Sequence, residues 1–158
     1  MNISSMEEGE YKTTYNTLAS VRCVFEKALT NNRAKCSLSS HFWLADREGY
    51  ACKVRESSDR CSQLLQILRE NSIFVLKLHE INGPLPHNME LRVQVGGLTG
   101  LAKLLEKDKD VQANQLVTDD IHRLLNTVID ESGSLDFLPY SKIIQSVVQF
   151  QGRQRRQR

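Results

Sequence analysis

Histidine, cysteine and acidic side chains, the usual metal ligands, are spaced so that no common metal motif is complete. His79 and Glu80 begin as a zinc-protease helix begins, but the next histidine, His87, follows two prolines. The two imidazoles therefore cannot share one face of a helix, as that motif requires. A mixed zinc site made of Cys52, Cys61, His79 and His87 has gaps that match no common ligand pattern. We therefore expect no metal ion.

The acidic stretch before residue 120 matches a calcium-binding loop only in part. Its oxygen-bearing side chains fall at ligand positions of such a loop: Asp108, Asp110, Gln112, Asn114 and Asp119. Ala113, however, stands where the sharp turn needs glycine, and Asp119 stands where a bidentate glutamate is expected. The sequence therefore predicts a solvated, charged linker over 106–115.

A glycine-rich stretch, 96–100, reads Gly-Gly-Leu-Thr-Gly and opens a helical pattern, as phosphate-binding loops do. It lacks the G-x-G-x-x-G order, and no lysine stands at the Walker position. A bend or a close approach between helices is the better interpretation. No G-x-S-x-G elbow is present, and no cysteine and histidine pair has an activating context. The sequence therefore predicts a protein that is not an enzyme and has no cofactor.

Four cysteines, Cys23, Cys36, Cys52 and Cys61, form an even set that would suit two disulfides. The start of the chain is polar and acidic, however, where a secretory signal is basic and then apolar. No apolar run approaches the roughly 18 to 20 residues that span a bilayer. We therefore expect a cytoplasmic or nuclear protein with reduced thiols and no membrane partner.

The positive charge is concentrated at the C-terminus. The formal net charge is +2, and four arginines among the last six residues contribute +4, which leaves −2 for residues 1–152. These arginines are Arg153, Arg155, Arg156 and Arg158. Such a tail is typical of an import signal or a nucleic-acid contact, but it also occurs as a plain solvated terminus.

The chain of 158 residues is about one domain long, and its most apolar stretch, 61–81, predicts a central helix. Two apolar seams at helical spacing indicate that this helix contacts neighbours on two sides. A serine or aspartate of 57–59 would cap its start, and the Asn-Gly-Pro-Leu-Pro stretch 82–86 would end it. The seams are Cys61, Leu64, Leu65, Leu68, Val75 and Leu76, and Ile67, Phe74, Leu78 and Ile81.

Upstream of this helix the pattern is less regular. Apolar spacing predicts a helix over 10–31. Residues 33–55 hold no single period for long. A short helix around Phe42 and Trp43 is expected there, capped by a preceding serine and ended by Gly49. Both aromatic side chains are expected to be buried.

Residues 89–95 fit two structures. They alternate apolar and polar side chains as a strand does, so a β-hairpin over about 73–95 is one interpretation. The same residues also begin a helical stripe that continues to Leu105. Gly96 and Gly97 would lie inside that helix at a cost of about 1 kcal/mol each relative to alanine. The helix is the preferred interpretation.

Two helices are predicted within 118–152. Thr118 can cap the first, two aspartates in its first turn favour the positive end of the helix dipole, and Gly133 ends it. Pro139 suits the first position of the second helix. Both helices repeat the same apolar spacing, which predicts an αα-hairpin.

Together these patterns predict an all-α fold, a small bundle of five to six helices with a C-terminal αα-hairpin. Residues 10–152 would form a single helical domain between a disordered N-terminus, 1–9, and a basic tail, 153–158. The alternative is an α+β fold with a β-hairpin at about 73–95.

The expected function is that of a non-catalytic interaction subunit or adaptor, which binds a protein partner or a second copy through apolar helix stripes. The C-terminal stripe would supply the contact through Ile143, Ile144, Val147 and Val148. The same four residues would equally serve as core. The alternative is a nuclear protein that binds RNA or DNA through the tail arginines, with an affinity that falls steeply with salt.

Overall fold

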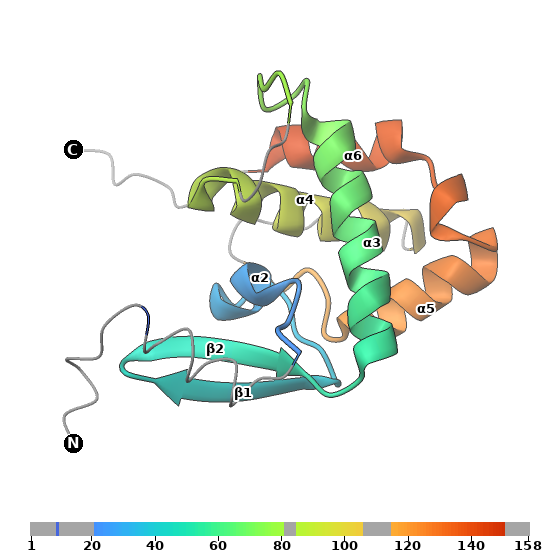
Figure 1. The fold of residues 1–158 in the computed structure, drawn as a ribbon. Coiled ribbons are helices and arrows are strands. Elements are labelled where there is room, and N and C mark those ends of the chain that lie inside the picture. Colours follow the sequence, from blue (N-terminus) through green and yellow to red (C-terminus); the bar gives the residue numbers. More distant parts are fainter. Residues whose placement is uncertain (1–8, 10–20, 81–84, 106–114, 151–158) are drawn as a thin grey trace.

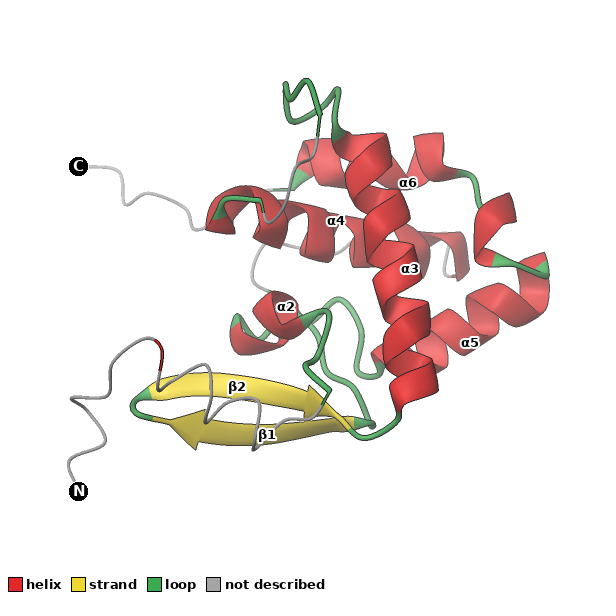
Figure 2. Cartoon of the chain, viewed as in Figure 1, coloured by secondary structure: helices red, strands yellow, loops and turns green. Residues whose placement is uncertain are grey.

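The structure, a computed structural model, describes residue 9 and residues 21–80, 85–105 and 115–150. Helices dominate these residues, and two short strands pair beside them (Figure 1 and Figure 2). The mostly helical fold predicted from the sequence is confirmed, but the all-α interpretation missed the sheet. The elements are α2 (Glu26–Thr30), β1 (Ser39–Leu44), β2 (Arg47–Cys52), α3 (Arg55–Ser72), α4 (His87–Leu105), α5 (Ile121–Ser132), η2 (Leu135–Phe137) and α6 (Tyr140–Gln149).

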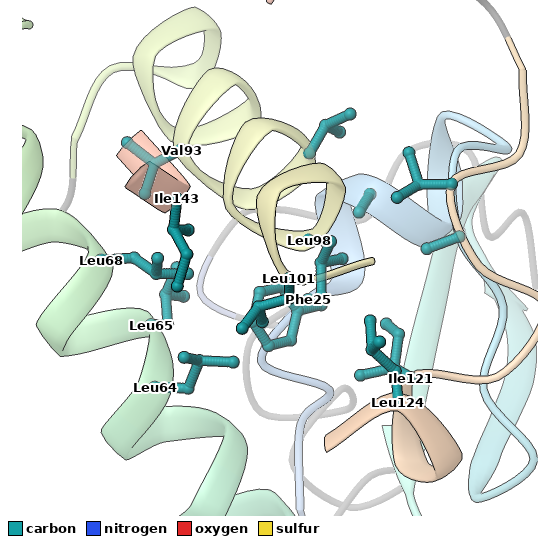
Figure 3. Close-up of a cluster of buried hydrophobic side chains, with 14 of the residues drawn as sticks. Phe25, Leu64, Leu65, Leu68, Val93, Leu98, Leu101, Ile121, Leu124 and Ile143 are labelled. Carbon is teal, nitrogen blue, oxygen red and sulfur yellow. The ribbon is translucent and has the colours of Figure 1, made fainter. Parts of the chain in front are cut away.

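Helix α4 is the centre of the packing. It contacts α6 most extensively and also touches α2, α3 and α5, while α2 lies between it and the β-hairpin (Figure 1). One hydrophobic core extends from Phe25 to Val147, and Figure 3 shows leucines of α3 pointing into it. Apolar residues recur every three or four positions along these helices, so each helix turns one stripe inward. Fully buried side chains include Phe25, Leu64, Leu68, Leu98, Leu101, Ile121 and Ile143.

The short helix predicted around residues 41–43 is wrong, because this stretch forms strand β1. It pairs antiparallel with β2, with His41 opposite Tyr50 and Leu44 opposite Arg47. Ala45 and Asp46 form the two-residue turn and both have positive φ, 50° and 68°, as the type I′ turn of a hairpin requires. Gly49 does not end a helix. It lies inside β2, where the Phe42 ring covers it so closely that a Cβ there would lie 2.5 Å from the ring.

The helix predicted over 10–31 is only partly correct. Residues 10–20 lie outside the described part of the chain, and residues 21–25 are not helical. Instead, the Cys23 amide donates to the Tyr50 carbonyl at 3.0 Å and the Cys52 amide donates to the Val21 carbonyl at 2.8 Å, which attaches this segment to the second edge of β2. In the described part of this range only α2 is helical, because the residues before it form backbone hydrogen bonds with β2 instead.

The helix predicted over 61–81 corresponds to α3, but α4 lies at the centre of the packing instead, and both ends of α3 were predicted too late. Helix α3 begins at Arg55, so the serines and aspartate expected to cap it lie inside its first turns, and Val54 at the N-cap makes no side-chain hydrogen bond. After Ser72 the chain makes one more turn. Lys77 adopts a positive φ of 58°, and the Leu78 amide donates to the Ile73 carbonyl at 3.0 Å. This is the left-handed end of a Schellman motif.

Helix α4 runs straight through the glycine-rich stretch, so the β-hairpin alternative over 73–95 is wrong and the helix is confirmed. The glycines allow close packing, since a Cβ at Gly96 would lie 2.6 Å from the Val147 Cα and one at Gly100 would lie 2.6 Å from the Ile143 carbonyl oxygen. The close approach between helices expected from this stretch is therefore what the structure shows, and α6 is the helix that approaches.

Helices α5 and α6 are where the sequence predicted them. Asp120, rather than Thr118, caps α5 by accepting from the His122 amide at 3.1 Å, and Gly133 ends the helix with a φ of 83°. Helix α6 begins directly after Pro139. The predicted αα-hairpin needs correction, however, because α6 takes its main contacts from α4 and α3, with η2 separating it from α5.

Candidate functional site

The α6 stripe expected to contact a partner faces the core. Ile143 and Val147 are fully buried and Ile144 is 7% exposed, whereas Val148 is 53% exposed. Arg92 of α4 also holds the end of α6, because its Nε donates to the Val147 carbonyl at 2.8 Å. A partner could therefore reach the first three side chains only if α6 left α4, and Val148 alone among the four is accessible.

The arginine tail lies wholly, and the rejected calcium loop mostly, outside the described residues. The tail arginines Arg153, Arg155, Arg156 and Arg158 belong to 151–158, and the first four positions of the rejected calcium loop belong to 106–114. The fifth, Asp119, forms an ion pair with Arg123 four residues later. This pair is exposed, so it contributes little to stability.

One face of the β-hairpin carries a cluster of aromatic side chains in contact with solvent. His41 stacks on Tyr50 with ring centroids 4.7 Å apart, and Trp43 meets His41 edge-on at 5.9 Å. The His41 Nε2 lies 3.0 Å from a Glu48 carboxylate oxygen. Trp43 is 62% exposed, so the expectation that it is buried is wrong. We call Trp43, His41, Tyr50 and Glu48 the hairpin face.

The four cysteines, far apart in the sequence, line a single small cavity. It lies where the end of β2, the first turns of α3 and the start of α5 meet, and its volume is about 30 Å³. Cys23, Cys36, Cys52 and Cys61 all border it, together with His122. None of the four forms a disulfide in the structure.

Burial raises the pKa of three of these thiols. It raises the pKa of Cys23 and of Cys61 to about 12, and the neighbouring cysteines raise both values further. Burial also raises the pKa of Cys36, although backbone amides of Leu38 and His122 that point at its sulfur oppose the shift. Neutral thiols of high pKa are poor nucleophiles, so burial makes Cys23 and Cys61 poor nucleophiles.

A larger cleft of about 480 Å³ lies between α2, α3 and α4, within the size range of small-molecule sites. Its floor is a buried ion pair that sequence reasoning missed. Arg69 donates through both Nε and Nη2 to the two oxygens of Glu90, whose side chain is 4% exposed. Gln94 donates to Glu90 at 3.2 Å and accepts from the Ala28 amide at 3.1 Å. Arg69, Glu90 and Gln94 thus join the three helices through hydrogen bonds to one another and to the α2 backbone.

Asp120 has a structural role as well. Burial alone would raise its pKa, but hydrogen bonds from the Ser37 amide and hydroxyl and from the amides of Arg123 and His122 outweigh burial and lower it. The Ser37 amide and hydroxyl lie 3.0 and 3.1 Å from the same carboxylate oxygen. This carboxylate therefore fixes the loop before β1 to the start of α5.

The mixed zinc site considered from the sequence is split in the structure. Cys52 and Cys61 line the small cavity, but His79 and His87 do not, and the His87 Nδ1 lies 2.8 Å from the Lys27 ammonium. Across the residues that the structure describes, no group of three or more histidine, cysteine or acidic side chains could hold a metal ion. In the same residues, no helix is both long and apolar enough to cross a membrane.

Comparison with known proteins gives no further guide, because no family model, no curated protein and no solved structure matches this chain. The signals for the hairpin face were weak: Phe42 and Trp43 favour a strand before Ala45 and Asp46, but after them only Tyr50 does. No sequence pattern indicated that the four cysteines converge.

Proposed function

We propose that this protein is a non-catalytic interaction subunit or adaptor that binds a protein partner through its hairpin face. The observation that carries the proposal is Trp43, a tryptophan 62% exposed to solvent near the end of strand β1. Tryptophan is among the residues most enriched at the energetic centres of protein interfaces. An exposed tryptophan on regular structure is thus a reasonable anchor for a partner.

The surroundings of Trp43 favour binding because they limit its motion before a partner arrives. The strand restricts its backbone, His41 meets its ring edge-on, and Tyr50 supports His41 from the opposite strand. A side chain that is already ordered loses less conformational entropy on binding. Glu48, directly opposite Trp43 in the register, adds a carboxylate beside the ring that favours a partner with a basic group.

The roles of the ionisable side chains support the absence of catalysis in this proposal. In the described part of the chain, Asp120 joins a loop to α5, Glu90 is satisfied inside an ion pair, and burial keeps the thiols of Cys23 and Cys61 protonated. Catalytic groups usually combine a shifted pKa with access to a substrate. These groups are instead engaged with the protein itself.

Replacing Trp43 by alanine is expected to weaken binding to the partner by about 30-fold or more, the effect of losing an interface anchor worth about 2 kcal/mol. Phe74→Ala is the matched control, because Phe74 is an aromatic residue 92% exposed on the turn after α3, away from the hairpin. Partners would be identified by crosslinking and mass spectrometry, and dissociation constants then measured with purified proteins.

An equal loss of binding in both variants, or none in Trp43→Ala, would rule out the hairpin face. Circular dichroism of each variant confirms that the fold is kept, which is expected because both side chains are exposed. Light scattering at several concentrations separates a foreign partner from a second copy of the chain.

A second function, binding to RNA or DNA, is favoured by one feature, the four arginines at 153–158. Deleting 153–158 is expected to abolish nucleic-acid binding if this function is real, and the affinity of the intact chain should fall steeply between low and physiological salt. Fluorescence anisotropy with a labelled oligonucleotide measures both. Binding to a protein partner through the hairpin face should survive the deletion, so the two functions separate in one experiment.

A further inference from the structure

Among the described residues, the chain pairs with only one of the two edges of the β-hairpin. Along β2, the Tyr50 carbonyl accepts from the Cys23 amide at 3.0 Å and the Cys52 amide donates to the Val21 carbonyl at 2.8 Å. β2 is also the strand next to α2, whereas β1 is the outer strand (Figure 1). The two edges therefore differ, because β2 is paired on both sides and β1 on one.

The turn and the register show which backbone groups of β1 face outward. Leu44 and Arg47 flank the two-residue turn, so they form the hydrogen-bonded pair that closes it. Such pairs alternate with non-hydrogen-bonded pairs along an antiparallel ladder, so the amides and carbonyls of His41 and Trp43 point away from β2. In the part of the chain that the structure describes, these four groups form no hydrogen bond. We call them the β1 edge.

We propose that the β1 edge binds an extended segment of the partner protein, which adds a third strand to the hairpin and places an arginine or lysine opposite Trp43. This inference rests on the proposed function, because it describes how the hairpin face holds that partner. An unpaired strand edge is a template for another strand. Strand addition obtains its affinity from main-chain hydrogen bonds, and its specificity from alternate side chains.

The sequence of β1 contains none of the residues that usually block an exposed edge. Soluble proteins protect such edges with lysine, proline or a bulge. β1 instead reads Ser-Ser-His-Phe-Trp-Leu and pairs with β2 without a break in register. His41 and Trp43 are both exposed. An approaching strand therefore meets an edge that carries no blocking side chain.

The side chains beside the β1 edge favour a basic residue on the added strand. Residues directly opposite on neighbouring strands share one face, so the residue opposite Trp43 would lie on the hairpin face. An arginine or lysine there is long enough to cross the Trp43 ring and reach Glu48, which lies opposite Trp43 on β2. The indole face attracts the cation, and the Glu48 carboxylate forms an ion pair with it. His41 lies 3.0 Å from one oxygen of this carboxylate, and the second oxygen can accept from the partner.

A second copy of the chain complements the β1 edge less well. Strand β1 paired with itself would supply no arginine or lysine, because Ser39–Leu44 contains neither. The Trp43 ring and the Glu48 carboxylate would then receive no permanent cation. Charge complementarity therefore favours a different protein as the occupant.

Short synthetic peptides test the β1 edge on the full chain. The probes are fluorescent heptapeptides of alternating valine and threonine with blocked ends and with arginine, lysine, glutamate or alanine at the centre. The arginine and lysine peptides should bind at least about tenfold more tightly than the other two in fluorescence anisotropy. Glu48→Gln should lose most of this preference, whereas the control Glu131→Gln, an exposed position on α5, should keep it.

His41→Pro removes one donor of the β1 edge, and His41→Ala is its matched control. Proline is tolerated in an edge strand where its nitrogen faces outward, so pairing with β2 should remain. Both variants lack the imidazole, but only His41→Ala keeps the amide proton. The arginine peptide and the partner should therefore bind at least about fivefold more weakly to His41→Pro than to His41→Ala.

Amide hydrogen exchange of the unmodified chain gives a measurement that does not depend on the folding of variants. The amides of His41 and Trp43 should exchange quickly in the free chain and at least about tenfold more slowly with saturating arginine peptide. The amides of Phe42 and Leu44, which face β2, should be protected in both states.

Three results would each overturn the proposal: no preference for the basic peptides, equal binding by His41→Pro and His41→Ala, or unchanged exchange at His41 and Trp43. Protection of these two amides by dimer formation without peptide would also overturn it and make a second copy the occupant. If Trp43→Ala weakens partner binding but the peptides do not bind, the hairpin face remains the interface and strand addition alone is excluded. If the basic peptides bind as expected but Trp43→Ala leaves partner binding unchanged, the proposed function fails while the β1 edge is retained as a peptide site.

Discussion

Replacing Gly100 by alanine is expected to destabilise the protein by about 2–3 kcal/mol, although alanine is the better helix former by about 1 kcal/mol. The added Cβ would lie 2.6 Å from the Ile143 carbonyl oxygen and 2.8 Å from the Ile143 Cα. Both atoms belong to the backbone of α6 and cannot rotate away. The two helices would therefore have to separate, and the packing between them would be lost along their length.

Gly97→Ala is the matched control, because Gly97 lies in the same helix, three residues earlier. Its added Cβ would meet the Leu68 side chain, with 2.5 Å to Cδ1. A leucine methyl group can move by a change of rotamer, although the burial of Leu68 makes this imperfect. The expected loss is below about 1 kcal/mol, because the gain in helix propensity offsets the strain.

Urea denaturation followed by far-UV circular dichroism measures both variants, and the midpoints are comparable if the slopes agree. Gly96→Ala should behave as Gly100→Ala does, since its Cβ would lie 2.6 Å from the Val147 Cα. Equal midpoints for Gly97→Ala and Gly100→Ala would contradict the assignment of Gly96 and Gly100 to the α4–α6 contact.

The sequence was most informative where local signals and apolar spacing agreed. Gly133 ends α5 where the sequence indicates, and the helix begins within three residues of the predicted cap, with Asp120 in place of Thr118. Pro139 marks the start of α6 in the same way. Such signals depend on the chemistry of a few neighbouring residues, so they can be recognised without knowledge of the tertiary structure.

The hairpin was missed because its turn is chemically unusual. A type I′ turn normally contains asparagine or glycine, which tolerate positive φ, but here Ala45 and Asp46 occupy the two positions. Its strands also carry aromatic residues on both faces, Phe42 on one and Trp43 on the other. The alternation that identifies a strand with one buried face is therefore absent.

The ends of α3 and the convergence of the cysteines depend on tertiary contacts. The apolar run continues past Ser72, so periodicity alone predicts a longer helix. The turn that follows α3 closes at Lys77 in a left-handed conformation, and no sequence signal marks a lysine for that conformation. Cys23 reaches the cavity because its segment pairs with β2. Non-local pairing of this kind has no signature within a short window of residues.

Arg69→Met is expected to destabilise the protein by about 2–4 kcal/mol, because it leaves the Glu90 carboxylate buried without its cation. Glu90 is 4% exposed at its side chain while Arg69 is 32% exposed, so the two partners are not equivalent. Removing the carboxylate instead, as in Glu90→Gln, lets Arg69 return to water and keeps an acceptor for Gln94. That variant should lose only about 1 kcal/mol.

The double variant Arg69→Met with Glu90→Leu separates the two explanations for this loss. If the cost of Arg69→Met arises from an uncompensated buried charge, replacing both partners by apolar side chains should recover most of the stability. If the ion pair itself joins α3 to α4, the double variant should be at least as unstable as the single one. Urea midpoints of the unmodified chain, Arg69→Met, Glu90→Leu and the double variant form a double-mutant cycle, and a coupling energy near zero would contradict the buried-charge argument. The first result is expected, because Gln94 still bonds to the Ala28 amide and the Val24 carbonyl and thus keeps α2 on α4.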